Sequence, residues 1–132
     1  MNKVTKACEA HWEVYKDDCS GFVKAVAKHV GVELTGQAND IVDQMQQTPW
    51  KVLKSGREAA GQAQLNFFVL GGLKETGHGH VVVVVPGPVD REAYPTAYWG
   101  KLNGTGKKAR TINWAWKPGD RDKVIYAFYD VK

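Results

Sequence analysis

Hydrophobic residues in the first half of the chain recur at the three- and four-residue spacing of amphipathic helices. The clearest case begins at Cys19 and continues to Val30, with Lys24 and Lys28 at positions between the apolar ones. Such a pattern buries one face of a helix and leaves the other in water. Three further stretches share the spacing, and Pro49 ends one of them because proline cannot continue a helix. Helices are therefore predicted over residues 3–14, 19–31, 39–47 and 57–64.

The second half of the chain consists of short runs of β-branched and aromatic residues, which are typical of strands. The clearest run goes from His80 to Val85, and Pro86 ends it in a loop. The pair Gly71-Gly72 is predicted to turn the chain after an earlier strand. Strands are predicted over residues 65–70, 80–85, 96–102, 110–116 and 123–129. This order predicts a single α+β domain over residues 1–132, in which N-terminal helices pack on an antiparallel sheet.

Cys19 is the first residue of its predicted helix and is followed by the small residues Ser20 and Gly21. A thiol at this position meets unpaired backbone N–H groups and the positive end of the helix dipole. We expect this environment to lower its pKa below the usual value of about 8.5 and to make it a nucleophile. The helix-start N–H groups would hold an oxyanion, with Trp12 or Tyr15 as a further donor. The alternative is a cysteine that only packs, since cysteine is among the most buried residue types.

A thiol nucleophile needs a general base, and His80 is placed for that role. It begins the valine strand, where a rigid element can aim its imidazole. His78 is the rival base two residues earlier, but glycines on both sides leave it unanchored. We therefore predict a catalytic pair of Cys19 and His80.

The third group, which would orient the imidazole of His80, is left open by the sequence. A histidine base is usually held by an acceptor at its far ring nitrogen. If strand 80–85 pairs with the next strand, the residues facing His80 include Asn103, which makes this asparagine the favoured candidate. The other candidates are Asp90, Glu92 and Asn113.

The chain has a formal net charge of +4, and its basic residues gather near the C-terminal end. They lie among aromatic residues: Lys107, Lys108, Arg110, Lys117, Arg121 and Lys123 occur near Trp114, Trp116, Tyr126 and Tyr129. This mixture is typical of a solvated face above buried aromatics, and it also suits an anionic cell-wall polymer. Basic and aromatic residues can bind nucleic acid. No nucleic-acid motif occurs, so we expect no nucleic-acid partner.

Scattered cysteines and histidines predict no metal site, and no cofactor is implied. Cys8 and Cys19 are expected to be free, because a bridged thiol cannot act as a nucleophile. The longest apolar run is far shorter than the roughly 20 residues of a membrane span. The N-terminal residues become polar too soon for a signal peptide, so we expect synthesis in the cytoplasm and release without a leader.

The cysteine and histidine segments together resemble a known superfamily. The order Asp18-Cys19-Ser20-Gly21 on a helix, followed by Gly79-His80-Val81 on a strand, is similar to papain-like cell-wall peptidases of the NlpC and CHAP kind. The remaining segments narrow the resemblance to the short peptidoglycan amidase effectors of bacterial type VI secretion. These segments are Gln37 to Ile41, the Trp50 region, Tyr94 to Gly100, Asn113 to Trp116 and Arg121 to Tyr126.

This resemblance implies a papain-like fold and a cysteine amidase that cuts amide bonds in peptidoglycan stem peptides or cross-links. It implies action in the periplasm of target bacteria and a cognate immunity protein that plugs the Cys19/His80 cleft. The family's third catalytic position does not match the spacing here. Three alternatives share the same features: a phage-type endolysin, a protein deamidase or acyltransferase on the same scaffold, and a non-catalytic cell-wall-binding module.

Overall fold

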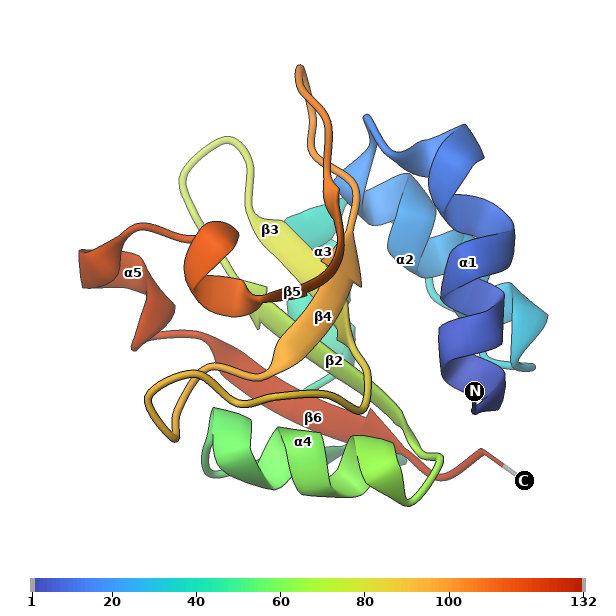
Figure 1. Ribbon diagram of the computed structural model, residues 1–132. Coiled ribbons are helices and arrows are strands. Elements are labelled where there is room, and N and C mark those ends of the chain that lie inside the picture. The colour runs from blue at the N-terminus through green and yellow to red at the C-terminus, as the bar shows by residue number, and fades with distance from the viewer. Residues whose placement is uncertain (1, 132) are drawn as a thin grey trace.

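The computed structural model describes residues 2–131, and its centre is a six-stranded sheet in which every neighbouring pair is antiparallel (Figure 1). The strand order is β1-β6-β2-β3-β4-β5. The strands are β1 (Lys51–Leu53), β2 (Phe68–Leu73), β3 (His80–Val84), β4 (Thr96–Trp99), β5 (Lys107–Thr111) and β6 (Ile125–Tyr129). The long central strands carry runs of valine and leucine because both of their faces are covered.

Helices cover both faces of the sheet, with α2 and α3 behind it and α4 in front of it in Figure 1. The helices are α1 (Lys3–Tyr15), α2 (Cys19–His29), α3 (Ala38–Gln44), α4 (Gly56–Gln64), α5 (Pro118–Arg121) and the short 3-10 helix η1 (Ile112–Trp114). Side chains alternate along β3, so Val81 and Val83 belong to the core under α2 while Val82 and Val84 belong to the core under α4. The α+β class with N-terminal helices on an antiparallel sheet is confirmed. No helix between residues 2 and 131 is long and apolar enough to cross a membrane.

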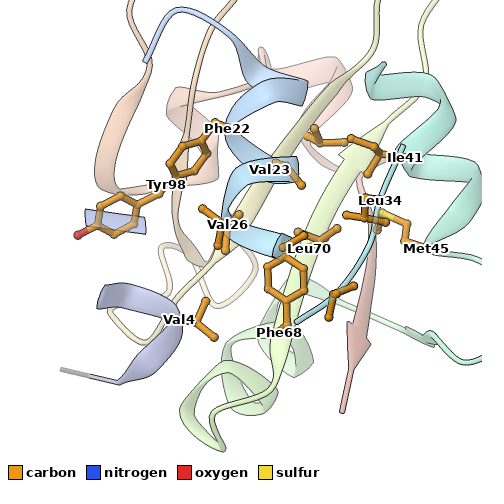
Figure 2. Close-up of a cluster of buried hydrophobic side chains, with 14 of the residues drawn as sticks. Val4, Phe22, Val23, Val26, Leu34, Ile41, Met45, Phe68, Leu70 and Tyr98 are labelled. Carbon is orange, nitrogen blue, oxygen red and sulfur yellow. The ribbon is translucent and has the colours of Figure 1, made fainter. Parts of the chain in front are cut away.

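The apolar face of α2 packs where its spacing predicts. Phe22, Val23 and Val26 are fully buried, and they lie among Leu70 and Tyr98 of the sheet (Figure 2). Burying each such side chain contributes about 1.5–3 kcal/mol. This packing fixes the helix against the middle of the sheet, and with it the residue at the helix start.

The predicted strand 65–70 was placed too early. Residues 65 and 66 form the turn after helix α4, with Asn66 in the left-handed region at φ 70°. Gly71 and Gly72 lie inside β2 and do not form a turn. A Cβ at residue 72 would lie 2.7 Å from the Val42 side chain, so glycine is needed where α3 packs closely on the strand.

Two other strands end several residues before their predicted ends. The predicted strand 110–116 was wrong in its second half, because the chain leaves the sheet after Thr111 and turns into η1. The predicted strand 96–102 stops at Trp99. Strand β1 and helix α5 were not predicted: both are very short, and β1 is an edge strand with an exposed Val52.

Candidate active site

Cys19 begins helix α2 as predicted, and its side chain is only 4% exposed. Asp18 is the N-cap, with extended backbone and a carboxylate oxygen that accepts a hydrogen bond from the N–H of Gly21 at 2.9 Å. An aspartate at this position satisfies one of the unpaired N–H groups of the first turn. The cap therefore sets the direction in which the helix leaves Cys19.

The expected lowering of the Cys19 pKa was wrong. Burial raises the pKa of this thiol above its usual value, and the negative charge of Asp18 raises it further. The backbone N–H groups of Val81, Ser20 and Cys19 itself lower the pKa, but burial is the largest effect. Desolvation disfavours a thiolate more than the first helical turn favours it. In the free protein Cys19 is therefore a neutral thiol at neutral pH.

The turn between α1 and α2 is docked onto the end of β4. The carbonyl oxygen of Lys16 accepts hydrogen bonds from the N–H groups of Lys101 and Gly106, at 3.0 and 2.7 Å. The indole Nε1 of Trp12 donates to the carbonyl oxygen of Trp99 at 3.1 Å. Trp12 is thus engaged in holding α1 on the sheet, and the prediction of Trp12 as a free oxyanion donor was wrong.

His80 is the first residue of β3 and pairs with Leu73 of β2. Its imidazole packs against two indoles, with ring centroids 5.0 Å from Trp116 and 6.5 Å from Trp99. Burial lowers the pKa of His80 from 6.5 to about 4, and the positive charge of Lys101 adds to this effect. His80 is therefore uncharged at neutral pH, in the form that can accept a proton.

The backbone of Val81 brings the two candidate residues to the same place. Its N–H acts on the thiol of Cys19, and Val81 directly follows His80. Within residues 2–131 no hydrogen bond joins the Cys19 thiol to the His80 ring. Catalytic hydrogen bonds are often long in an empty site and shorten only when substrate is bound. A buried thiol therefore lies near the strand residue that directly follows a neutral base.

His78 lies in the exposed loop before β3, whereas the neighbouring Gly79 is buried. A Cβ at residue 79 would overlap the amide oxygen of Asn39. The Nδ2 of Asn39 also donates to the carbonyl oxygen of Glu75 at 2.9 Å, so this asparagine fastens the loop to α3. The loop is anchored at Gly79 and leaves His78 in solvent.

The four candidates for the third position occupy different environments. Asn103 is exposed in the left-handed region of a turn, at φ 59°. Asp90 lies 3.7 Å from Arg91, and Glu92 is exposed and lies 3.9 Å from Arg57. Asn113 alone among them has a buried acceptor: its Oδ1 is buried without a hydrogen-bond partner.

The pairing of β3 with β4 joins Val83 to Tyr98 and Val84 to Ala97. Continued by three residues, this register places Lys101 opposite His80, in agreement with the effect of its charge on the His80 ring.

The aromatic residues around His80 are the part of the site that sequence reasoning missed. Trp99 and Trp116 are 1% and 6% exposed, so their hydrophobicity alone marks them as core residues. Lys101 is exposed and looks like any surface lysine. Only the strand register and the turn at η1 bring these three residues to the imidazole.

The remaining predicted features lie outside this site. Cys8 and Cys19 are both free, and Cys8 is completely buried. Residues 2–131 contain no group of three or more histidine, cysteine or acidic side chains that could hold a metal ion. Strand β5 carries most of its basic side chains into solvent, and the guanidinium of Arg110 lies 5.3 Å above the exposed Trp114 ring.

Comparison with known proteins gives one clear relationship. No family model matches the chain. The chain is similar to the peptidoglycan amidase Tse1 of Pseudomonas aeruginosa, with 37% identity over an alignment of 139 positions that covers 97% of this chain and 90% of the relative. Identity at this level over nearly the whole of both chains shows common descent. The protein belongs to the family of peptidoglycan amidase Tse1, the type VI secretion amidase effectors that its cysteine and histidine segments resemble.

Proposed function

We propose that this protein is a hydrolase that cleaves amide bonds in peptidoglycan, with Cys19 as nucleophile and His80 as general base. The full-length similarity to a peptidoglycan amidase supports the substrate. The observation that supports the mechanism is that the backbone N–H of Val81, the residue after the neutral His80, lowers the pKa of the Cys19 thiol. We further propose that residues 1–132 act as a single amidase domain.

The reaction begins with transfer of the thiol proton from Cys19 to the ring of His80. The thiolate attacks the amide carbonyl carbon and forms a tetrahedral intermediate, whose oxyanion is held by N–H groups at the start of α2. The imidazolium of His80 then gives its proton to the leaving amine, the C–N bond breaks, and a thioester forms on Cys19. Water attacks the thioester while His80 takes its proton, which releases the carboxylic acid product and the free thiol.

Burial of both residues affects the first step, the proton transfer from Cys19 to His80. A buried thiolate beside a buried imidazolium is costly unless both charges are well paired. The raised pKa of Cys19 and the lowered pKa of His80 both favour the neutral pair in the free protein. Proton transfer then accompanies substrate binding, when the backbone N–H groups can stabilise the developing oxyanion.

The proposed substrate is the stem peptide or cross-link of peptidoglycan, and the proposed route is that of a type VI effector. Stem peptides carry carboxylates, and exposed lysines such as Lys101 and Lys107 lie near this end of the sheet. The protein would be made in the cytoplasm of a producing bacterium and act in the periplasm of its target. The producer would need a cognate inhibitor protein that covers the Cys19/His80 site.

The substrate is tested by incubating the protein with purified sacculi and identifying the released fragments by mass. We expect fragments that have gained one water at an amide bond, with a new amine and a new carboxyl end. Cys8→Ala is the matched control, since it removes the other thiol and should leave the fragment pattern unchanged. Absence of any amide cleavage by a folded protein would overturn the proposed substrate, and a protein target would then take its place.

A further inference from the structure

The ring of His80 is held by aromatic packing. Among residues 2–131 neither of its ring nitrogens has a hydrogen-bond partner, although a histidine base is usually oriented by one. Its ring contacts are with Trp116, at 5.0 Å and 65° between planes, and with Trp99, at 6.5 Å and 89°. Both arrangements are the edge-to-face kind that aromatic pairs prefer.

Trp116 reaches His80 from the turn that follows β5. Its backbone N–H donates to the carbonyl oxygen of Ile112 at 3.2 Å, so the turn at η1 fixes the direction of the indole. Ile112 is completely buried and anchors this turn in the core under α4. Trp116 therefore stands on a turn that is hydrogen-bonded and anchored in the core.

The same turn carries two unpaired polar atoms. The Nε1 of Trp116 and the Oδ1 of Asn113, three residues earlier, are buried without a hydrogen-bond partner. Each such atom costs about 1–3 kcal/mol of stability. A phenylalanine or leucine at residue 116 would avoid one of these costs. The indole is therefore a poor choice for stability alone, and its contact with His80 gives it another role.

We propose that Trp116 is a positioning residue for His80, whose ring holds the imidazole by packing in place of a hydrogen-bonding third side chain. This inference rests on the proposed role of His80 as the base. The indole limits rotation of the imidazole, and it excludes water from one side of the ring. The charged groups that act at this site are Lys101, on the His80 ring, and Asp18, on the Cys19 thiol.

The test compares Trp116→Leu, which removes the aromatic ring, with Trp116→Phe, which keeps an aromatic ring but is smaller than indole and lacks the N–H. Trp114→Leu is the control, because Trp114 is 62% exposed on the same turn. We expect Trp116→Leu to lower kcat by about 10- to 100-fold, with KM changed by less than about threefold, since a misaligned base affects the chemical step. Trp116→Phe and Trp114→Leu should stay within about threefold of wild type.

A second readout is independent of substrate: titration of the His80 ring by NMR. In the wild-type protein its midpoint should lie near the pKa of about 4 that burial imposes, and in Trp116→Leu it should rise toward 6.5 as water enters. Trp116→Met fills much of the volume without a ring and replaces the leucine variant if that one does not fold. This titration separates the two proposals, because it holds even if peptidoglycan is not the substrate.

Three results would overturn the role of Trp116. One is an unchanged kcat and an unchanged His80 titration in a folded Trp116→Leu protein. Another is an equal loss in the phenylalanine and leucine variants, which would show that an aromatic ring at residue 116 is not what holds the imidazole. The third is a loss of kcat in Asn113→Ala as large as that in Trp116→Leu, which would make Asn113 the orienting residue.

Discussion

At the scale of single residues, burial sets the protonation of both candidate catalytic groups. The N–H groups at the start of α2 act on Cys19, yet desolvation keeps its thiol protonated. Desolvation also keeps the imidazole of His80 uncharged. In such a neutral pair, we expect the proton to move from the thiol to the imidazole only when substrate is bound.

The two histidines near β3 should differ sharply when each is replaced. We expect His80→Ala to suppress amide cleavage about as strongly as Cys19→Ala, and the double variant to be little worse than either, because residues that act together are not additive. His78→Ala should keep most activity, since His78 lies in solvent. Initial rates on one soluble stem peptide measure all four variants. Reversed behaviour of the two histidines would move the base to His78.

The lowered pKa of His80 makes stability depend on pH. Its folded pKa of about 4 is below the ordinary 6.5, so the unfolded chain takes up the proton first. His80 therefore opposes folding progressively as pH falls from 6.5 to about 4, by roughly 3 kcal/mol in total. Urea unfolding should show wild type losing about that much more stability than His80→Asn between about pH 7 and pH 4. Equal losses in both proteins would show that His80 is not buried as described.

At the scale of elements, a close approach of two backbones places Cys19 beside the start of β3. Gly100 follows β4, and a Cβ at this residue would overlap the carbonyl oxygens of Tyr15 and Asp18. Backbone atoms cannot move aside as a flexible side chain can. The absence of a side chain at Gly100 therefore lets the turn before α2 settle against the sheet.

Gly100→Ala should displace the turn that carries Cys19. Overpacking of this kind typically costs about 1–3 kcal/mol, and the shift of the nucleophile should lower kcat by about 100-fold. Gly104→Ala is the matched control in the same loop, since its nearest neighbour would be the flexible Lys101 side chain at 3.3 Å. Thermal unfolding and initial rates, measured together, give both effects. Wild-type activity in Gly100→Ala would show that the close approach does not position Cys19.

Sequence predicts best the helices and strands that have a long, uninterrupted hydrophobic pattern. Helix α2 and strand β3 have uninterrupted patterns, and both begin at the predicted residues, Cys19 and His80. The two catalytic candidates lie at these boundaries, so sequence was sufficient to place them at the starts of their elements. Strand β2 was predicted at the wrong residues because Gly71-Gly72 has the composition of a turn. Glycine is needed there because Gly72 packs closely against Val42, which is distant in sequence.

The surroundings of the candidate site depend on tertiary contacts, which the hydrophobic periodicity of the sequence does not reveal. Trp116 was predicted in a strand, yet it lies just beyond η1 and meets His80 through the fold. The pKa of Cys19 was predicted from the helix dipole alone, and the burial that outweighs it comes from neighbouring elements. The candidate residues can therefore be picked out from sequence, whereas their pKa values depend on burial by elements that are distant in sequence.

At the scale of the whole molecule, the chain belongs to a family whose named relative acts on peptidoglycan. The proposed activity predicts toxicity that depends on compartment. Expression in the bacterial cytoplasm should be harmless, because mature sacculus is absent there, whereas expression with a periplasmic signal should lyse the cells. Cell lysis is followed by turbidity, with Cys19→Ala as the matched inactive protein. Equal toxicity in both compartments would favour a cytoplasmic target.

The central claim is that the thiol of Cys19 cleaves peptidoglycan, and the most direct test is the rate of fragment release by Cys19→Ala beside wild type. Alanine at the start of α2 removes only a sulfur atom, and the cap from Asp18 to Gly21 remains, so the variant should fold. We predict a loss of more than about 10³-fold in the rate of amide cleavage in purified sacculi. A folded Cys19→Ala protein that keeps more than a few per cent of the wild-type rate would contradict the claim.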